Sequence, residues 1–227
     1  GRRRARQGRR LPDHMGGSVH RLRPGSEAGP HTSAARTGWQ ALGRIRGVFF
    51  ADGGGYTSLQ GIHAMQEPGL YTLTISGTLP VQEPYAQTSF SFSQSVLIRR
   101  GDYPFDPVLV VSPETIDPAV TKPEDAEWSA LAGSFTAEKL WQGQFKSPAP
   151  EPFSDCWPST FGNRRSYNGS AYSYFHTGLD FCGGVGVEIL APAAGVVVFA
   201  GPLTVRGNAT MINHGWGIYS GYMHQSE

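Results

Sequence analysis

At residues 175–181 the chain reads FHTGLDF, and this stretch decides which fold and which chemistry to expect. It places a histidine and a carboxylate, His176 and Asp180, four residues apart. On a straight strand the two would lie about 13 Å apart, at about 3.3 Å per residue, whereas zinc needs each donor atom at about 2 Å. Gly178 and the flanking aromatic residues disfavour a helix, so a shared metal requires a turn, for which Gly178 supplies backbone freedom. The spacing alone leaves open whether the pair binds a metal or is structural.

Strand-like segments follow this stretch. We expect residues 185–200 to form two strands joined by a turn, and residues 209–212 and 218–223 to form a hairpin. His224 comes directly after the last segment, and strict alternation places its side chain on the same face as Tyr222. The pattern alone leaves His224 as either a functional residue or an exposed strand residue.

The segments upstream differ in character. Residues 48–111 predict an all-β domain, because residues 71–75 and 89–98 alternate and residues 107–111 form a short apolar run.

Residues 112–147 instead predict a linker with short helices. Caps followed by proline and acids, as at residues 121–125, are typical of helix starts. We therefore expect helices at residues 125–131 and 135–140.

The charge distribution separates the first residues from the rest. The formal net charge is +1, yet residues 1–47 hold 11 arginines against two acidic residues, and the remainder is acidic. Because residues 1–47 lack apolar periodicity, we expect a disordered, Arg-rich leader that need not be native to the protein. A nucleic-acid-binding arm is the other reading, but Trp39 is the only aromatic residue there, and we expect no nucleic-acid partner.

Composition also limits the class of protein. The apolar stretch at residues 189–200 is too short to span a bilayer and contains proline and glycine, so we expect no transmembrane segment. Two cysteines are too few for a cysteine-rich zinc module. No signal peptide is visible after Gly1, and we take the sequence as a fragment that is open at both ends.

Five short motifs follow one another in the C-terminal third of the chain. They read FGNR at 161–164, HTGLDF at 176–181, ILAPAAGVV at 189–197, GN at 207–208 with INHG at 212–215, and YSGYMH at 219–224. In this order they resemble the lysostaphin-type, or LytM-like, zinc metallopeptidases, which cut peptide bonds in bacterial peptidoglycan. Residues 48–75 are similar to a β-sandwich domain that precedes the peptidase in some members.

The resemblance implies a mainly β fold. We expect a small immunoglobulin-like sandwich followed by an incomplete LytM-like peptidase domain of the duplicated hybrid motif type. The expected limits are a leader at 1–47, the immunoglobulin-like domain at 48–111, a linker at 112–147, and the N-terminal part of the peptidase domain at 148–227.

The resemblance also implies roles for single residues. His176 and Asp180 would bind Zn²⁺, and His224 would be a catalytic histidine beside the metal. The family completes its site with a later His-x-His motif, and the sequence ends at Glu227 before any such motif. We therefore expect the whole protein to be a zinc endopeptidase that cleaves peptide stems or cross-bridges of peptidoglycan, and this chain by itself to bind zinc weakly and to be inactive.

Two other functions stay open. One is a catalytically inactive family member that binds peptidoglycan or activates another cell-wall hydrolase. The other is an adhesion or cell-surface module in which the upstream sandwich binds the ligand. The sequence does not indicate the oligomeric state or the bond that is cleaved.

The remaining candidates each have two or more interpretations. Cys156 and Cys182 form a disulfide, remain free thiols, or place Cys182 on the zinc; a disulfide would fit an extracytoplasmic location. Tyr174, with its neighbouring tyrosines, lines a groove for peptide or glycan, or lies on a hairpin surface. Arg164 and Arg165 bind substrate carboxylates or pair with local acids.

Overall fold

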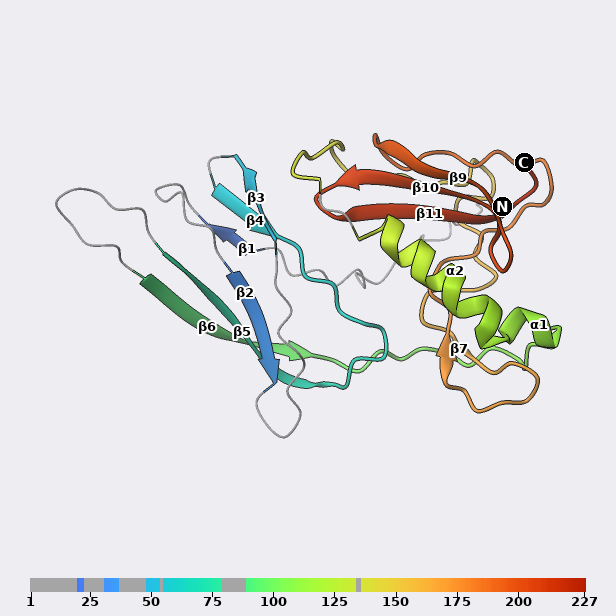
Figure 1. Cartoon of the computed structure of the whole chain (residues 1–227), viewed down its shortest axis with the longest axis horizontal. Helices are drawn as coiled ribbons and strands as arrows, with labels where there is room; N and C mark the ends of the chain where they lie inside the picture. The colour runs from blue at the N-terminus through green and yellow to red at the C-terminus, as the bar shows by residue number, and fades with distance from the viewer. Residues whose placement is uncertain (1–19, 23–30, 37–47, 54, 79–88, 134–135) are drawn as a thin grey trace, which may run out of the picture. The chain divides into compact units, whose positions relative to one another are not determined.

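The structure, a computed structural model, is mainly β and divides into two compact units (Figure 1). The N-terminal unit comprises Gly1–Arg99 and the C-terminal unit Arg100–Glu227. No helix among the described residues combines the length and apolar character needed to cross a membrane. The described residues are 20–22, 31–36, 48–53, 55–78, 89–133 and 136–227.

The N-terminal unit contains two antiparallel sheets of three strands each. One has the order β1-β4-β3 and the other β2-β5-β6. The predicted alternating segments form the long hairpin of the second sheet, in which Gly69 pairs with Ile98 and Thr78 with Ser89. The strands are β1 (His20–Leu22), β2 (His31–Arg36), β3 (Phe49–Asp52), β4 (Gly55–Ser58), β5 (Gly69–Thr78) and β6 (Ser89–Ile98).

Few of the side chains described in this unit are fully buried. Phe50, Tyr71 and Ile75 are its buried apolar residues, and the last two lie on one face of β5, as the alternation predicts. An immunoglobulin-like arrangement of the two sheets stays a prediction.

Two strands fall within the segment predicted to be a disordered leader. β1 and β2 form backbone hydrogen bonds with β4 and β5. The expectation of disorder considered only side-chain composition, which does not include such backbone pairing. The rest of residues 1–47 lies outside the described residues, and the assignment of a leader stays a prediction.

The C-terminal unit begins with two helices, α1 (Pro113–Ile116) and α2 (Pro118–Leu131). The prediction of a helix start at residues 121–125 is wrong, because Asp117 caps α2 earlier by accepting a hydrogen bond from the Ala119 amide at 2.8 Å. Pro118 occupies the first helical position, and Pro123 lies inside the helix at the loss of one backbone hydrogen bond.

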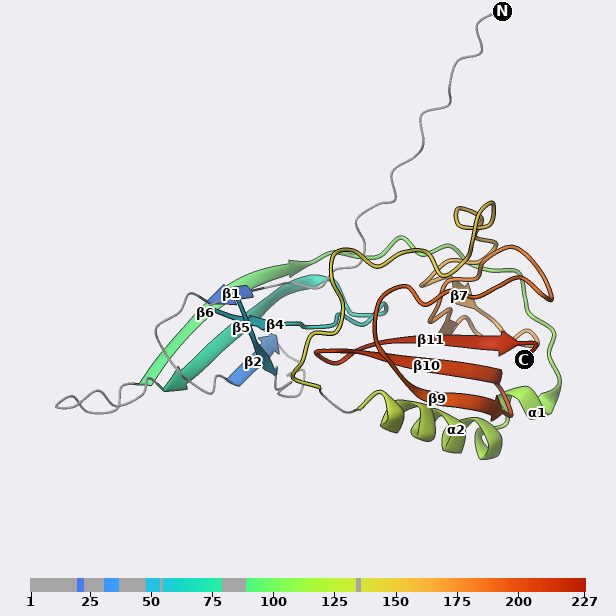
Figure 2. The same cartoon turned by 90° about the horizontal axis from the view of Figure 1, so that it is seen from above.

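An antiparallel sheet of three strands, ordered β11-β10-β9, forms the centre of this unit (Figure 2). Its strands are β9 (Val196–Leu203), β10 (Gly207–Gly215) and β11 (Ile218–Gln225), so the predicted hairpin is present. The central strand β10 carries six buried residues, namely Ala209, Met211, Ile212, Asn213, His214 and Gly215.

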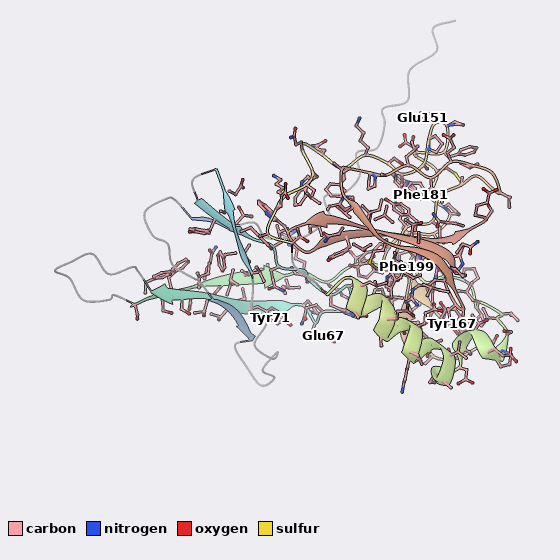
Figure 3. All side chains as sticks on the ribbon, turned by 45° about the horizontal axis from the view of Figure 1, so that its top comes forward. Glu67, Tyr71, Glu151, Tyr167, Phe181 and Phe199 are labelled. Carbon is pink, nitrogen blue, oxygen red and sulfur yellow. A yellow bond between two sulfur atoms is a disulfide. The ribbon has the colours of Figure 1, made fainter. Side chains whose placement is uncertain are left out.

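Helix α2 packs against this sheet. Phe199 projects from β9 toward the helix (Figure 3), where its ring meets Trp128 edge-on at 6.3 Å between centroids. Glu124, 6% exposed, accepts hydrogen bonds from the Val205 amide at 2.8 Å, the Arg206 amide at 3.1 Å and the Arg206 guanidinium at 2.8 Å. Burial raises the pKa of Glu124, but these hydrogen bonds lower it by more, so its pKa lies below the ordinary value.

Two predicted elements are absent from the described residues. Residues 185–195 form turns and irregular chain rather than a strand, with the Leu190 amide bonded to the Pro148 carbonyl at 2.8 Å. Residues 136–140 are not helical, because they run beside the end of β10, where Lys139 pairs with Gly215. A Cβ at Gly215, which has φ of +89°, would collide with the Glu138 carbonyl oxygen.

The apolar run at residues 107–111 forms a single bridge rather than a strand. Phe105 and Leu109 pair in parallel with Arg164 and Tyr167, which belong to the C-terminal unit. The compact units accordingly divide at Arg99 and Arg100, whereas the domain limits derived from the sequence stay predictions.

Candidate metal centre

The FHTGLDF stretch begins in strand β8 (Tyr174–Phe175), which pairs with β7 (Arg164–Arg165), and continues as an irregular loop. Backbone hydrogen bonds hold this loop against residues 156–163. The His176 amide donates to the Asn163 carbonyl at 2.8 Å, and the Asp180 amide donates to the Ser159 carbonyl at 2.9 Å. Both candidate ligands therefore have fixed backbone positions.

A disulfide links residues 156–163 to the chain that follows the FHTGLDF loop. Cys156 and Cys182 are bonded, with 5.3 Å between their Cα atoms, and the Cys182 amide also donates to the Cys156 carbonyl at 2.9 Å. The alternatives of two free thiols and of Cys182 as a zinc ligand are therefore not seen.

The loop brings the two predicted ligands together. His176 Nε2 and Asp180 Oδ1 are 3.2 Å apart, although a straight strand would separate the two residues by about 13 Å. The His176 side chain is 11% exposed, whereas the Asp180 side chain is 52% exposed. The pair thus combines a largely buried imidazole with a carboxylate that solvent reaches.

Both ring nitrogens of His176 have polar partners. Nδ1 lies 3.2 Å from the Thr160 carbonyl oxygen, which can only accept, and 3.1 Å from the Ser159 hydroxyl. Burial lowers the pKa of His176, and Arg165 lowers it further, while Asp180 raises it by less than these combined. Asp180 Oδ1, which also only accepts, faces Nε2 at 3.2 Å, so a proton on either ring nitrogen has an acceptor.

These donors fit a zinc ion. Two donor atoms at about 2.0–2.1 Å from a tetrahedral zinc lie about 3.3 Å apart, close to the 3.2 Å observed. A cation could bind Nε2 and Oδ1 together at this spacing, and a ligand histidine is typically oriented through its other nitrogen, as His176 Nδ1 is by the Thr160 carbonyl. Within the part of the chain that the structure describes, no group of three or more His, Cys, Asp or Glu side chains is arranged to hold a metal.

Gly178 was expected to supply backbone freedom for the turn between His176 and Asp180, but the structure shows a different role. Its φ is not in the left-handed region, so the turn does not depend on glycine's freedom there. A Cβ at this position would instead lie 3.6 Å from His176 Nε2, and a longer side chain would cover the nitrogen. The small residue keeps the donor accessible.

His224 lies at a β-bulge, so the expected alternation from Tyr222 fails. Thr210 pairs with Tyr222 and Asn208 with Gln225, which inserts one extra residue into β11. His224 has φ of +58° and is exposed, and its amide donates to the Arg206 carbonyl at 2.8 Å. The structure places it outside the His176 and Asp180 pair, and its catalytic role stays a prediction.

Arg164 and Tyr174 have local partners. The Arg164 guanidinium donates to the Tyr172 carbonyl and lies over the Phe105 ring at 6.0 Å. Tyr174 is 52% exposed, and its ring meets that of Tyr167 edge-on at 5.2 Å. Substrate binding by either residue stays a prediction.

Sequence reasoning missed one acidic residue near the pair. Asp106 accepts a hydrogen bond from Arg165 Nε at 3.2 Å, and Arg165 Nη2 lies 3.7 Å from Asp180 Oδ2. Of the two readings for Arg165, the structure thus shows pairing with local acids. Asp106 precedes every motif of the resemblance, and no pattern around it indicates a role.

Comparisons with known proteins agree with the C-terminal assignment. Residues 174–227 match the family model described as "Peptidase family M23". A comparison with curated proteins finds no significant match.

Among solved structures, the chain is similar to a crystal structure from Pseudomonas aeruginosa, whose description assigns it provisionally to peptidase M23. The two share 22% identity at a TM-score of 0.50, over 92% of this chain and 72% of that one, which is a likeness of fold. On the motifs and this match, residues 174–227 are similar to the LytM-type peptidases of family M23.

Proposed function

We propose that the protein is a zinc-dependent endopeptidase that cleaves peptide stems or cross-bridges of bacterial peptidoglycan. The observation that carries this proposal is the 3.2 Å approach of His176 Nε2 to Asp180 Oδ1 within a peptidase-family segment. Zinc held by these atoms would supply Lewis-acid activation of a peptide carbonyl and of the attacking water.

The described residues prepare the two donors. The Thr160 carbonyl can accept a hydrogen bond from Nδ1 of His176, and with the proton there Nε2 would bind a cation without first losing a proton. The amide of Asp180 is fixed by Ser159, and the carboxylate stays accessible from solvent. Catalytic zinc usually takes three protein donors, so these two alone should bind the ion weakly, and hydrolysis requires a third.

An inactive relative that binds peptidoglycan, or activates another hydrolase, is the second candidate. It is favoured by the two-donor arrangement of the described residues. In either case the disulfide between Cys156 and Cys182 supports an extracytoplasmic location, where disulfides persist.

Zinc titration of the full chain by calorimetry, in a buffer that does not chelate metals, tests the metal assignment. We expect saturable binding of one ion. His176→Ala and Asp180→Asn should each weaken it by more than about tenfold, because even outer residues of a metal site contribute 10–100-fold. Asp155→Asn, which changes another exposed carboxylate of this unit, is the control and should bind zinc like the wild type.

Incubation with purified peptidoglycan separates the two candidates. New amino termini that appear with zinc, and fail to appear for Asp180→Asn, support the endopeptidase. Sedimentation of the chain with peptidoglycan that neither produces new termini nor depends on zinc supports the inactive binder. The absence of saturable zinc binding in the wild type would remove the basis of the endopeptidase.

A further inference from the structure

Asp106 connects several residues that surround the two donors. Its Oδ1 accepts a hydrogen bond from Asn163 Nδ2 at 2.6 Å, and its Oδ2 accepts one from Arg165 Nε at 3.2 Å. Its backbone carbonyl accepts a hydrogen bond from the Tyr172 hydroxyl at 2.9 Å. The Asp106 side chain is 16% exposed, so these contacts are shielded from water and screened little by salt.

Arg165 extends this connection to the oxygen donor. One edge of its guanidinium pairs with Asp106, while Nη2 lies 3.7 Å from Asp180 Oδ2. The Asp180 oxygen on the Arg165 side is therefore distinct from Oδ1, which faces His176. This arrangement favours a carboxylate that offers one oxygen rather than two to a cation.

Ser159 extends it to the nitrogen donor. Its hydroxyl lies 3.1 Å from His176 Nδ1, 3.1 Å from Arg165 Nη2 and 3.5 Å from Asp106 Oδ2. Because Arg165 only donates, the hydroxyl oxygen accepts from it, and its own hydrogen is available for the Asp106 carboxylate. Asp106 thus influences both donors, one through Arg165 and one through Ser159.

We propose that Asp106 is a positioning residue of the metal centre, which orients the His176 and Asp180 donors through Ser159 and Arg165. This inference rests on the proposed zinc function. It adds a residue that lies outside the family match at 174–227 and does not touch the ion itself.

Two measurements on the full chain test the proposal. Asp106→Asn keeps the size of the side chain but places an amide where Arg165 and Ser159 need an acceptor. We expect its zinc affinity, measured by calorimetry, to fall about tenfold. The ring nitrogens of His176, observed by long-range ¹H–¹⁵N NMR without zinc, should show a different balance of the two protonated forms in the variant than in the wild type.

A double-mutant cycle distinguishes positioning from general destabilisation. If Asp106 acts in part through Arg165, the combination of Asp106→Asn and Arg165→Gln should lose less zinc affinity than the product of the two single losses. Glu124→Gln is the matched control, because it removes a buried carboxylate from an arginine in the same unit. It should lower the free energy of unfolding and leave zinc affinity unchanged.

The outcomes separate this inference from the proposed function. Wild-type zinc affinity in Asp106→Asn, or multiplicative losses in the cycle, would overturn the positioning role while the zinc site stands. A wild type that binds no zinc, with an NMR change in the variant, would overturn the zinc function and leave only the orientation of the imidazole. Absence of both effects would overturn both proposals.

Discussion

Removing the disulfide should destabilise the C-terminal unit by a predictable amount. Cys156 and Cys182 are 26 residues apart in sequence and close a loop of about 27 residues. On the chain-entropy model, opening such a loop costs roughly 3.5 kcal/mol. Against a total stability of about 5–15 kcal/mol, this is a large fraction. The loop contains His176 and Asp180, so zinc affinity should fall as well.

Urea unfolding, followed by tryptophan fluorescence, measures this change. Four of the five tryptophans lie in the C-terminal unit, namely Trp128, Trp141, Trp157 and Trp216, so the signal reports chiefly on that unit. The double variant Cys156→Ser and Cys182→Ser is compared with the oxidised wild type, and the reduced wild type serves as the control for the serine substitutions.

The reasoning predicts that the double variant and the reduced wild type lose the same free energy of unfolding. A loss below about 1 kcal/mol in both would refute it, because the backbone hydrogen bonds between residues 156–163 and 176–182 would then hold the loop without the covalent link.

Three further predictions concern stability and pH. Glu124→Gln should lower the free energy of unfolding, measured in urea titrations, by about 3–5 kcal/mol, because it removes one partner of a buried ion pair. On the same helix, the substitution Glu127→Gln at an exposed position should change this free energy by under about 0.5 kcal/mol. Gly215→Ala should lower the melting temperature far more than Gly143→Ala, since both glycines have positive φ but only the first has a backbone carbonyl in the way. Folding lowers the pKa of His176 from 6.5, so the unfolded chain takes up the proton first as pH drops, and the free energy of unfolding should fall below about pH 6.5. In urea unfolding at pH 7 and pH 5, His176→Gln should show a smaller fall than the wild type. An equal fall would contradict the burial of His176.

The sequence predicted that His176 and Asp180 would have to lie close together if they share a metal. His176 and Asp180 lie in one loop, so a short motif contains both, and the requirement for a turn between them follows from donor distances alone. The β10–β11 hairpin was also predictable, because its alternation and its glycine-rich turn are contiguous in sequence.

Features that depend on distant contacts were not predictable. Asp106 reaches the pair through residues more than 50 positions later in the chain, and no local pattern encodes that pairing. Residues 185–191 have the apolar character of a strand, but they form no strand, and the Leu190 amide donates a hydrogen bond to the Pro148 carbonyl. Apolar composition alone does not distinguish these two forms of extended chain.

The bulge at His224 shows a third limit. Alternation assumes that each residue of β11 has one partner on β10, and one extra residue between Tyr222 and Gln225 breaks that rule. The positive φ of His224 is uncommon for a residue other than glycine. The residues next to it in the sequence do not predict this backbone conformation.

The pairing of residues 105–109 with 164–167 has a practical consequence for protein engineering. A gene trimmed to begin at residue 148, the predicted start of the peptidase domain, would encode all five motifs and yet leave out Asp106 and helix α2 with Glu124. Expression of the C-terminal half for crystallography or for screening should therefore start near Arg100. A shorter product would expose the face of the sheet that Trp128 covers, and we expect it to aggregate.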